Sequence, residues 1–170
     1  IFKDFFLGSD PPLTPVILIS QLAGIVDYGQ SSKELQTNSF YHVYNRGNNK
    51  EEVFKYADDK QLFINQLYKN KDICQIKLVS YCIMDNHFHL LIKTGRDPKK
   101  LSNYMQRVTT SYAVNINRKR NRVGHIFQGR YSANYLPYKK NQMRVLSYIK
   151  QNPVRDGIVK KPSDYRWTKV

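Results

Sequence analysis

Acidic residues are missing from one long stretch of this chain. No Asp or Glu occurs between Asp97 and Asp156, whereas the same stretch contains thirteen Lys or Arg residues. The net charge is +15, and residues 1–38 contribute −2 of it (two lysines against four acidic residues), so residues 39–170 carry +17. Such one-sided charge is typical of a surface that binds a polyanion, and nucleic acid is the polyanion that we expect.

Cysteine is scarce, since the chain contains only Cys74 and Cys82. The two residues are expected on one strand, where eight positions correspond to a separation of about 26 Å. That separation excludes a disulfide between them. Two buried thiols are typical of a protein in a reducing compartment.

Long apolar runs are also lacking. No run reaches the roughly 18 residues that a membrane-spanning helix needs. Residues 11–26 come closest, but prolines and a glycine interrupt them and no basic segment precedes them. We therefore expect neither a membrane span nor a signal peptide, and we expect a cytoplasmic, nucleoid-associated protein.

The chain is long enough for one domain with a hydrophobic core. Residues 1–38 differ from the rest in charge and in proline content, and we interpret them as an N-terminal extension to which no role is assigned. Residues 39–170 are interpreted as the functional domain.

Hydrophobic periodicity after residue 38 predicts a mixture of strands and helices. Asp58 is expected to cap the first helix, and Pro153 to end the last one at Gln151, because the residue before a proline avoids the α-helical conformation. The order β-α-β-β-α-β-α predicts an α+β, ferredoxin-like fold, with one antiparallel sheet and helices packed on one face. The expected strands are 40–45, 73–84, 87–93 and 126–136, and the expected helices are 58–69, 98–117 and 139–151.

His87 and His89 lie on the third predicted strand. Side chains two positions apart on a strand point to the same face, so the two imidazoles are expected about 6–7 Å apart. This geometry suits two ligands of one divalent metal ion, but two half-exposed surface histidines would show the same pattern. The sequence has no His-Glu-x-x-His, no Pro-Cys-x-x-Cys and no Gly-x-x-x-x-Gly-Lys motif, which excludes several other metal or phosphate sites.

Tyr148 differs from the other tyrosines of the chain by its position in the last predicted helix. An aromatic side chain on a polar helical face is unusual, although an exposed tyrosine lying against a neighbouring element would show the same pattern. The apolar side of this helix is expected to contain Met143, Leu146 and Ile149, and the polar side Arg144, Tyr148, Gln151 and Asn152.

Four stretches of the chain, in this order and spacing, resemble one protein family. They are residues 41–47 (YHVYNRG), 84–91 (MDNHFHLL), 124–131 (GHIFQGRY) and 147–157 (SYIKQNPVRDG). Residues 39–170 are similar to the REP-associated tyrosine transposases, the single-tyrosine members of the HUH endonuclease superfamily. Residues 1–38 have no counterpart in this resemblance.

The resemblance implies a metal-dependent endonuclease and strand transferase that acts on single-stranded hairpin DNA through a 5′-phosphotyrosine intermediate. It implies that His87 and His89 are metal ligands, that Asn152 is a third, amide-type ligand, and that Tyr148 is the nucleophile. Two imidazoles and one amide suit Mg²⁺ or Mn²⁺ better than Zn²⁺. The partners expected are hairpin DNA and, as an open question, a second copy of the chain in a homodimer.

Basic and amide side chains are the candidates for DNA contacts. Arg144 lies one turn from Tyr148 and is also a candidate cation for favouring the phenolate. If about six phosphate contacts form, affinity should fall roughly a thousandfold between 50 and 200 mM salt. The candidates are Asn45 and Arg46 at the end of the first strand, Arg118, Lys119, Arg120 and Arg122 in a predicted loop, Gln128 and Arg130 on one strand face, and Arg144.

Two other functions remain open from the sequence. One alternative is a non-catalytic module that binds nucleic acid, for example RNA. The other is a degenerate transposase that still binds its hairpin. Both alternatives retain the basic surface and differ from the enzyme in lacking a working nucleophile.

Overall fold

The computed structural model describes residues 35–170, so the predicted N-terminal extension lies outside the described residues except for its last four positions. One antiparallel sheet forms the centre of the fold, with strand order β4-β1-β3-β2-β5. The strands are β1 (Phe40–Arg46), β2 (Lys77–Ile83), β3 (His87–Lys93), β4 (Ser132–Tyr135) and β5 (Thr168–Lys169). The α-helices are α2 (Ala57–Lys71), α3 (Lys100–Lys119) and α4 (Lys139–Arg155), and short 3₁₀ turns lie at Asn48–Lys50 and Pro162–Asp164.

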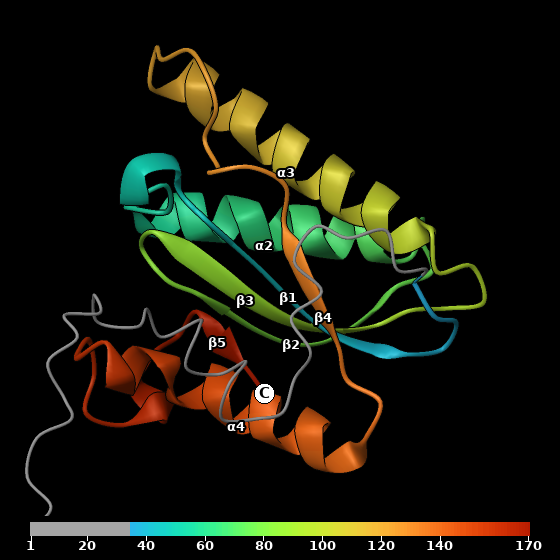
Figure 1. Cartoon of the computed structure of the whole chain (residues 1–170). Helices are drawn as coiled ribbons and strands as arrows, with labels where there is room; N and C mark the ends of the chain where they lie inside the picture. Colours follow the sequence, from blue (N-terminus) through green and yellow to red (C-terminus); the bar gives the residue numbers. More distant parts are fainter. Residues whose placement is uncertain (1–34) are drawn as a thin grey trace, which may run out of the picture.

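The helices cover both faces of this sheet (Figure 1). Neighbouring residues of a strand point to opposite faces, and β3 shows both environments. Phe88 packs against Phe63 of α2, with ring centroids 4.9 Å apart, whereas His89 faces Tyr148 of α4 at 5.2 Å. The α+β class and the antiparallel sheet are confirmed, and α2 and α3 share one face as expected, but α4 lies on the other face.

Both faces of the central strands are apolar enough to need a cover, which explains the position of α4. The middle of β3, Phe88 to Ile92, is buried on both sides. A strand buried on both faces requires a packing layer on each side. The aromatic core on the α2–α3 side consists of Phe54, Phe63, Phe88, Tyr112 and Phe127.

Helix α4 continues past Pro153, contrary to the prediction that it ends at Gln151. A proline lacks one N–H group, and near the end of a helix this removes a single hydrogen bond. The turn closes normally afterwards, because the backbone N–H of Asp156 donates to the Asn152 carbonyl at 3.0 Å. Tyr148 and Asn152 therefore keep the full i, i+4 relation of an α-helix.

Other element boundaries also differ from the prediction. Helix α2 begins at Ala57, and the carboxylate that accepts the backbone N–H of Tyr56, at 3.1 Å, belongs to Asp59 and not to Asp58. Strand β4 has only four residues, because residues 128–130 are bent.

Strand β2 begins at Lys77, so Cys74 precedes it. Both cysteines are buried and free, which confirms that they form no disulfide.

Within residues 35–170, no helix combines the length and the apolar character needed to cross a membrane.

Candidate active site

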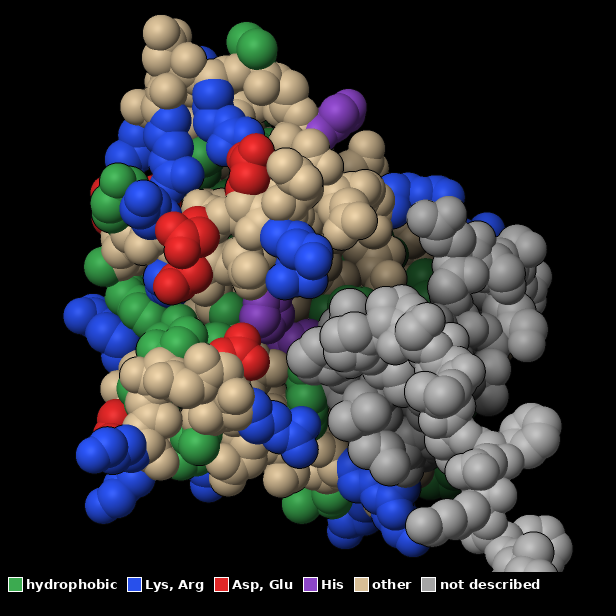
Figure 2. All heavy atoms as spheres, turned by 60° about the vertical axis from the view of Figure 1, so that its left-hand side comes forward, with side chains coloured by type: hydrophobic (Ala, Val, Ile, Leu, Met, Phe, Trp, Pro, Cys, Tyr) green, Lys and Arg blue, Asp and Glu red, His purple; other side chains and the backbone are tan. Residues whose placement is uncertain are grey.

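The two predicted histidines lie side by side on the face of β3 that α4 covers. Their ring centroids are 5.1 Å apart. His89 is almost fully buried, and His87 is half-buried near the end of the strand. Figure 2 shows a small group of histidine side chains open to the surface in the middle of one face, with basic and acidic side chains around it. The pair is therefore neither a core contact nor a fully solvated patch.

Tyr148 and Asn152 project from α4 onto this histidine pair. The buried side of α4 contains Val145, Tyr148, Ile149 and Asn152, whereas Met143, predicted to be apolar core, is 55% exposed. The prediction that Tyr148 and Asn152 lie on the side of the helix opposite Ile149 is wrong, because all three share the buried side. The sequence pattern could not reveal it, because the helix packs a polar strip onto a sheet face that is itself polar at His87 and His89.

Asn152 contacts His87 directly. Its Oδ1 atom lies 3.3 Å from Nε2 of His87, while Nδ1 of the same ring lies 2.6 Å from Oδ1 of Asn86. A neutral imidazole carries one proton, and the shorter contact takes it. Nε2 of His87 therefore presents a lone pair toward the amide oxygen of Asn152, an arrangement in which a cation fits between the two atoms.

Burial keeps these histidines neutral. It lowers the pKa of His87 and lowers that of His89 well below its usual value, since a charged imidazole is penalised away from water. A neutral imidazole is the form that can bind a metal ion.

The donor atoms fit a divalent metal ion. Nε2 of His89 is buried and makes no hydrogen bond, and an unpartnered buried nitrogen next to His87 and Asn152 suits a ligand position. Among residues 35–170, no cluster of three or more His, Cys, Asp or Glu side chains is arranged to hold a metal. A metal here would therefore need the Asn152 amide as its third protein ligand.

The Tyr148 hydroxyl is subject to opposing influences. Its pKa is raised to about 12, mainly by burial and to a smaller extent by the nearby Asp156 carboxylate. Arg155 and a hydrogen bond with Asn152 lower it, and the Arg155 guanidinium lies 5.0 Å from the centre of the ring. The predicted cation was Arg144, which is an exposed residue of α4. Arg155 is seven positions after Tyr148, hence on the same helical face, and it was missed because the helix was predicted to end earlier.

His42 is a further residue of the site that the sequence analysis did not single out. It lies on β1, is 1% exposed, and its Nε2 is 3.0 Å from Nδ1 of His89. In the sequence, His42 alternates with Tyr44 and Arg46, which places the three side chains on one face of β1. This pattern indicates a place in the site only when β1 is known to pair with β3.

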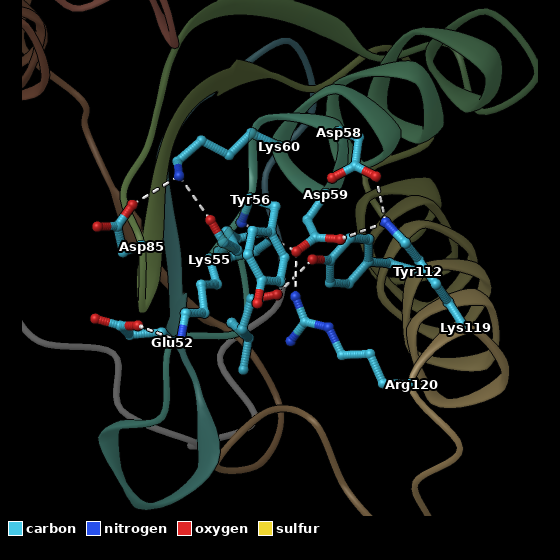
Figure 3. Close-up of polar contacts among 12 residues, drawn as sticks. Glu52, Lys55, Tyr56, Asp58, Asp59, Lys60, Asp85, Tyr112, Lys119 and Arg120 are labelled. Atoms are coloured by element: carbon cyan, nitrogen blue, oxygen red, sulfur yellow. Dashed lines mark hydrogen bonds and ion pairs between the residues drawn. The ribbon is translucent and has the colours of Figure 1, made fainter.

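Three of the four predicted loop cations are engaged with acidic side chains. Lys119 contacts Asp58 and Asp59, and Arg120 also contacts Asp59, which lies between the two cations (Figure 3). Arg122 pairs with Glu51 at 2.9 Å. Arg120 and Arg122 follow α3, whereas Arg118 and Lys119 belong to its last turn, contrary to the prediction. Arg118 is exposed there.

A second group of DNA-binding candidates lines one groove. The groove has a volume of about 1690 Å³ and lies between α3 and residues 124–135. Asn45, Gln128 and Arg130 all line it, and the Asn45 amide donates to the Gly129 carbonyl at 3.0 Å. Gln128 and Arg130 are exposed but lie in a bent segment, so the prediction that they share a strand face is wrong. Arg46 lies apart from this group, opposite His87 in the strand register.

Comparison with known proteins supplies the family. The chain matches the family of IS200-like transposases over residues 35–152. It belongs to this transposase family. A solved structure described as a REP-associated tyrosine transposase bound to a REP hairpin superposes with a TM-score of 0.70 at 15% identity, over 82% of this chain and 81% of that one.

A second structure, from Deinococcus radiodurans and also described as a transposase, has a TM-score of 0.49 at 12% identity, over 72% of this chain and 96% of that one. No curated protein matches the chain by sequence. At these identities the structural likeness concerns the fold of the transposase, and the family assignment comes from the sequence match.

Proposed function

We propose that this transposase is a metal-dependent single-stranded DNA nickase and strand transferase in which Tyr148 is the nucleophile. The observation that carries the proposal is the convergence of Tyr148 and Asn152 of α4 with His87 and His89 of β3. A hydroxyl, an amide oxygen and two neutral imidazole nitrogens meet at one partly open point.

The reaction is a transesterification at one DNA phosphate. The Tyr148 oxygen attacks phosphorus, the bond from phosphorus to the 3′ oxygen breaks, and the phenolic proton is lost while the leaving 3′ oxygen gains one. The products are a 5′-phosphotyrosine and a free 3′-hydroxyl. A later 3′-hydroxyl reverses the step and joins DNA, because a phenol is a better leaving group than an alcohol.

His87, His89 and Asn152 would hold Mg²⁺ or Mn²⁺, which supplies charge stabilisation at the phosphate oxygens when bound. Arg155 stabilises negative charge on the phenol oxygen, which offsets part of the effect of burial. Arg46, opposite His87 on the neighbouring strand, is a candidate contact for the scissile phosphate.

The proposed substrate is a DNA hairpin with an unpaired flank. Support comes from the excess positive charge and from the described hairpin complex of the structural relative. The groove lined by Asn45, Gln128 and Arg130 is the proposed path of the unpaired strand. Within residues 35–170 its lining combines amides, hydroxyls, aromatic rings and one guanidinium and includes no acidic side chain.

Tyr148→Phe tests the nucleophile. With a labelled hairpin oligonucleotide and Mn²⁺, wild type should give a covalent protein–DNA product and Tyr148→Phe none, while the two bind the hairpin equally. Tyr138→Phe, which changes an exposed tyrosine just before α4, is the matched control and should cleave normally. Cleavage by Tyr148→Phe would disprove the assignment.

His87→Ala combined with His89→Ala tests the metal site. Mn²⁺-dependent cleavage should disappear in this double variant. Cleavage by wild type in the presence of a chelator would contradict the metal dependence.

A second candidate is a transposase-derived protein that binds hairpin DNA without cutting it. One observation favours it, namely that burial raises the pKa of Tyr148 to about 12. Hairpin binding without any covalent product, across a range of pH and metal ions, would support this candidate over the enzyme.

A further inference from the structure

His42 is a buried polar side chain that contacts His89 from the neighbouring strand β1. Its ring stacks on that of His89, with centroids 5.1 Å apart and an angle of 28° between the planes. The contact joins Nε2 of His42 to Nδ1 of His89 at 3.0 Å. Both side chains are almost completely buried, so water does not replace the contact.

The contact links the protonation of the two rings. Each neutral imidazole has one N–H group, and a hydrogen bond between two ring nitrogens needs one donor and one acceptor. If Nδ1 of His89 donates, Nε2 of His89 keeps its lone pair. If Nε2 of His42 donates instead, the proton of His89 must lie on its Nε2. A protonated Nε2 cannot bind a metal ion.

The remaining nitrogens do not fix this choice. Nδ1 of His42 and Nε2 of His89 are both buried and have no hydrogen-bond partner. The rings that pack on His42 from the side are those of Tyr44, at 5.1 Å, and Tyr148, at 6.1 Å. Among the described residues, the hydrogen-bond partner of the His89 ring is Nε2 of His42.

We infer that His42 is a positioning residue for the metal site: its Nε2 accepts a hydrogen bond from the Nδ1–H group of His89, which leaves the lone pair of His89 Nε2 directed toward the metal. The inference rests on the proposed metal site. A ligand histidine generally donates its other N–H to a fixed acceptor, which sets the tautomer and the orientation of the ring. Here the acceptor is an imidazole and not the usual carboxylate or carbonyl oxygen.

Asn86 has the corresponding role for His87, the other proposed metal ligand. Its Oδ1 lies 2.6 Å from Nδ1 of His87, so the proton of that ring is held on the side away from Asn152. The two ligands are thus oriented by different partners, one from the β2–β3 turn and one from β1. This difference lets His42 be changed without disturbing the contact of His87.

The test compares Mn²⁺ affinity in the full chain without DNA. Wild type, His42→Phe and His42→Gln are titrated with Mn²⁺ and followed by electron paramagnetic resonance. His42→Phe keeps an aromatic ring but has no acceptor, so its affinity should fall about 10- to 100-fold. His42→Gln places a carbonyl oxygen near the position of Nε2 and should recover most of the affinity.

The ordering of the two variants separates positioning from packing. If His42 only fills space, the phenylalanine variant should bind Mn²⁺ as wild type does and the glutamine variant should bind worse. That ordering would overturn the inference. If the wild-type protein binds no Mn²⁺, or if His89→Ala binds Mn²⁺ as tightly as wild type does, the proposed metal site itself is disproved.

A second measurement does not depend on any variant. In the Mg²⁺-loaded wild-type protein, long-range ¹H–¹⁵N spectra report which nitrogen of each histidine carries the proton. We expect His89 protonated at Nδ1 and His42 protonated at Nδ1, with Nε2 of His42 as the acceptor. A proton on Nε2 of His42 would overturn the inference.

Discussion

Tyr148 lies close to the candidate metal ligands, but its burial disfavours ionisation of its hydroxyl. Its hydroxyl reaches the candidate metal ligands because α4 buries it against β3, and the same burial disfavours the phenolate that must attack phosphorus. Arg155 is the nearby group that opposes this penalty. Substitutions that change the burial of Tyr148 or remove Arg155 should therefore change the pKa of Tyr148 and the rate of cleavage.

Replacement of Arg155 by Gln should slow cleavage. Loss of the cation should raise the pKa of Tyr148 further, and a change of one pKa unit corresponds to about a tenfold change in the phenolate fraction. Because Arg155 is exposed and its field is screened by solvent, we expect a decrease of about three- to tenfold in the single-turnover rate. Arg144→Gln, an exposed arginine on the same helix, is the control. An equal effect of both variants would contradict the role of Arg155.

The buried histidines should make folding sensitive to mild acid. Burial lowers the pKa of His42 from 6.5 to about 4, so the unfolded chain binds the proton more tightly than the native protein does. This contribution to stability is complete above pH 6.5 and is lost as the pH falls toward 4. For His42 it amounts to at most about 3 kcal/mol.

Urea unfolding at pH 7.0, 5.5 and 4.5 measures this loss. His42→Phe should show a smaller decrease in the free energy of unfolding than wild type, while His125→Gln, at an exposed position, should show the same decrease. An identical pH dependence in His42→Phe would contradict the assignment.

At the scale of elements, the ends of α2 and α3 are joined by one buried carboxylate. Asp59 has no exposed side-chain surface, and it contacts both Lys119 and Arg120 at the end of α3 (Figure 3). Lys60, next along α2, contacts Asp85 at 2.6 Å in the turn that precedes His87. These ion pairs connect the two helices on one face of the sheet with the strand that bears the histidines.

Asp59→Asn should destabilise the protein by about 1.5–3 kcal/mol, because a buried carboxylate that contacts two cations is replaced by a neutral amide. Asp58→Asn removes an exposed partner of the same lysine and should change stability much less. Chemical denaturation measures both. Equal effects would show that the burial of Asp59 is unimportant.

The whole molecule combines a basic surface with ion pairs that neutralise part of it. Arg118 and Arg130 are exposed, whereas Lys119, Arg120 and Arg122 contact carboxylates. Cations already paired in the protein must exchange partners to bind phosphate and so release fewer counterions. The exposed arginines at the helix end and in the groove should therefore dominate the electrostatic part of DNA binding.

Arg118→Gln together with Arg130→Gln should reduce the slope of log affinity against log salt by about 1.4 to 1.8, for two lost phosphate contacts. Fluorescence anisotropy of a labelled hairpin between 50 and 200 mM salt gives the slope. Arg122→Gln, which removes a cation paired with Glu51, should change the slope much less. A larger effect of Arg122→Gln would contradict the expectation that a cation paired with a carboxylate contributes less to DNA binding.

One chain contains all the proposed site residues, since Tyr148 contacts His89 of the same chain. The sequence left a homodimer open, and we expect the chemistry to proceed without one. We expect the cleavage rate to increase in direct proportion to protein concentration, without the steeper dependence of an enzyme that is active only as a dimer. A second-order increase at low concentration would indicate that two chains are needed.

The sequence by itself determined the features that depend on local pattern. Alternation and helical periodicity predicted the order of strands and helices, and the two-residue spacing predicted that His87 and His89 share a face. One-sided charge predicted a polyanion as partner. The resemblance, carried by four short stretches, implied the transposase family, which the match over residues 35–152 confirms.

Only the tertiary structure decided which distant residues meet. The pairing of β1 with β3 brings His42 to His89, and the packing of α4 on the far face of the sheet brings Tyr148, Asn152 and Arg155 to the pair. In the tertiary structure, three of the predicted DNA-binding cations are paired with carboxylates. Such contacts depend on strand order and on which helical face is buried, and both result from packing across the whole sheet, which local periodicity does not encode.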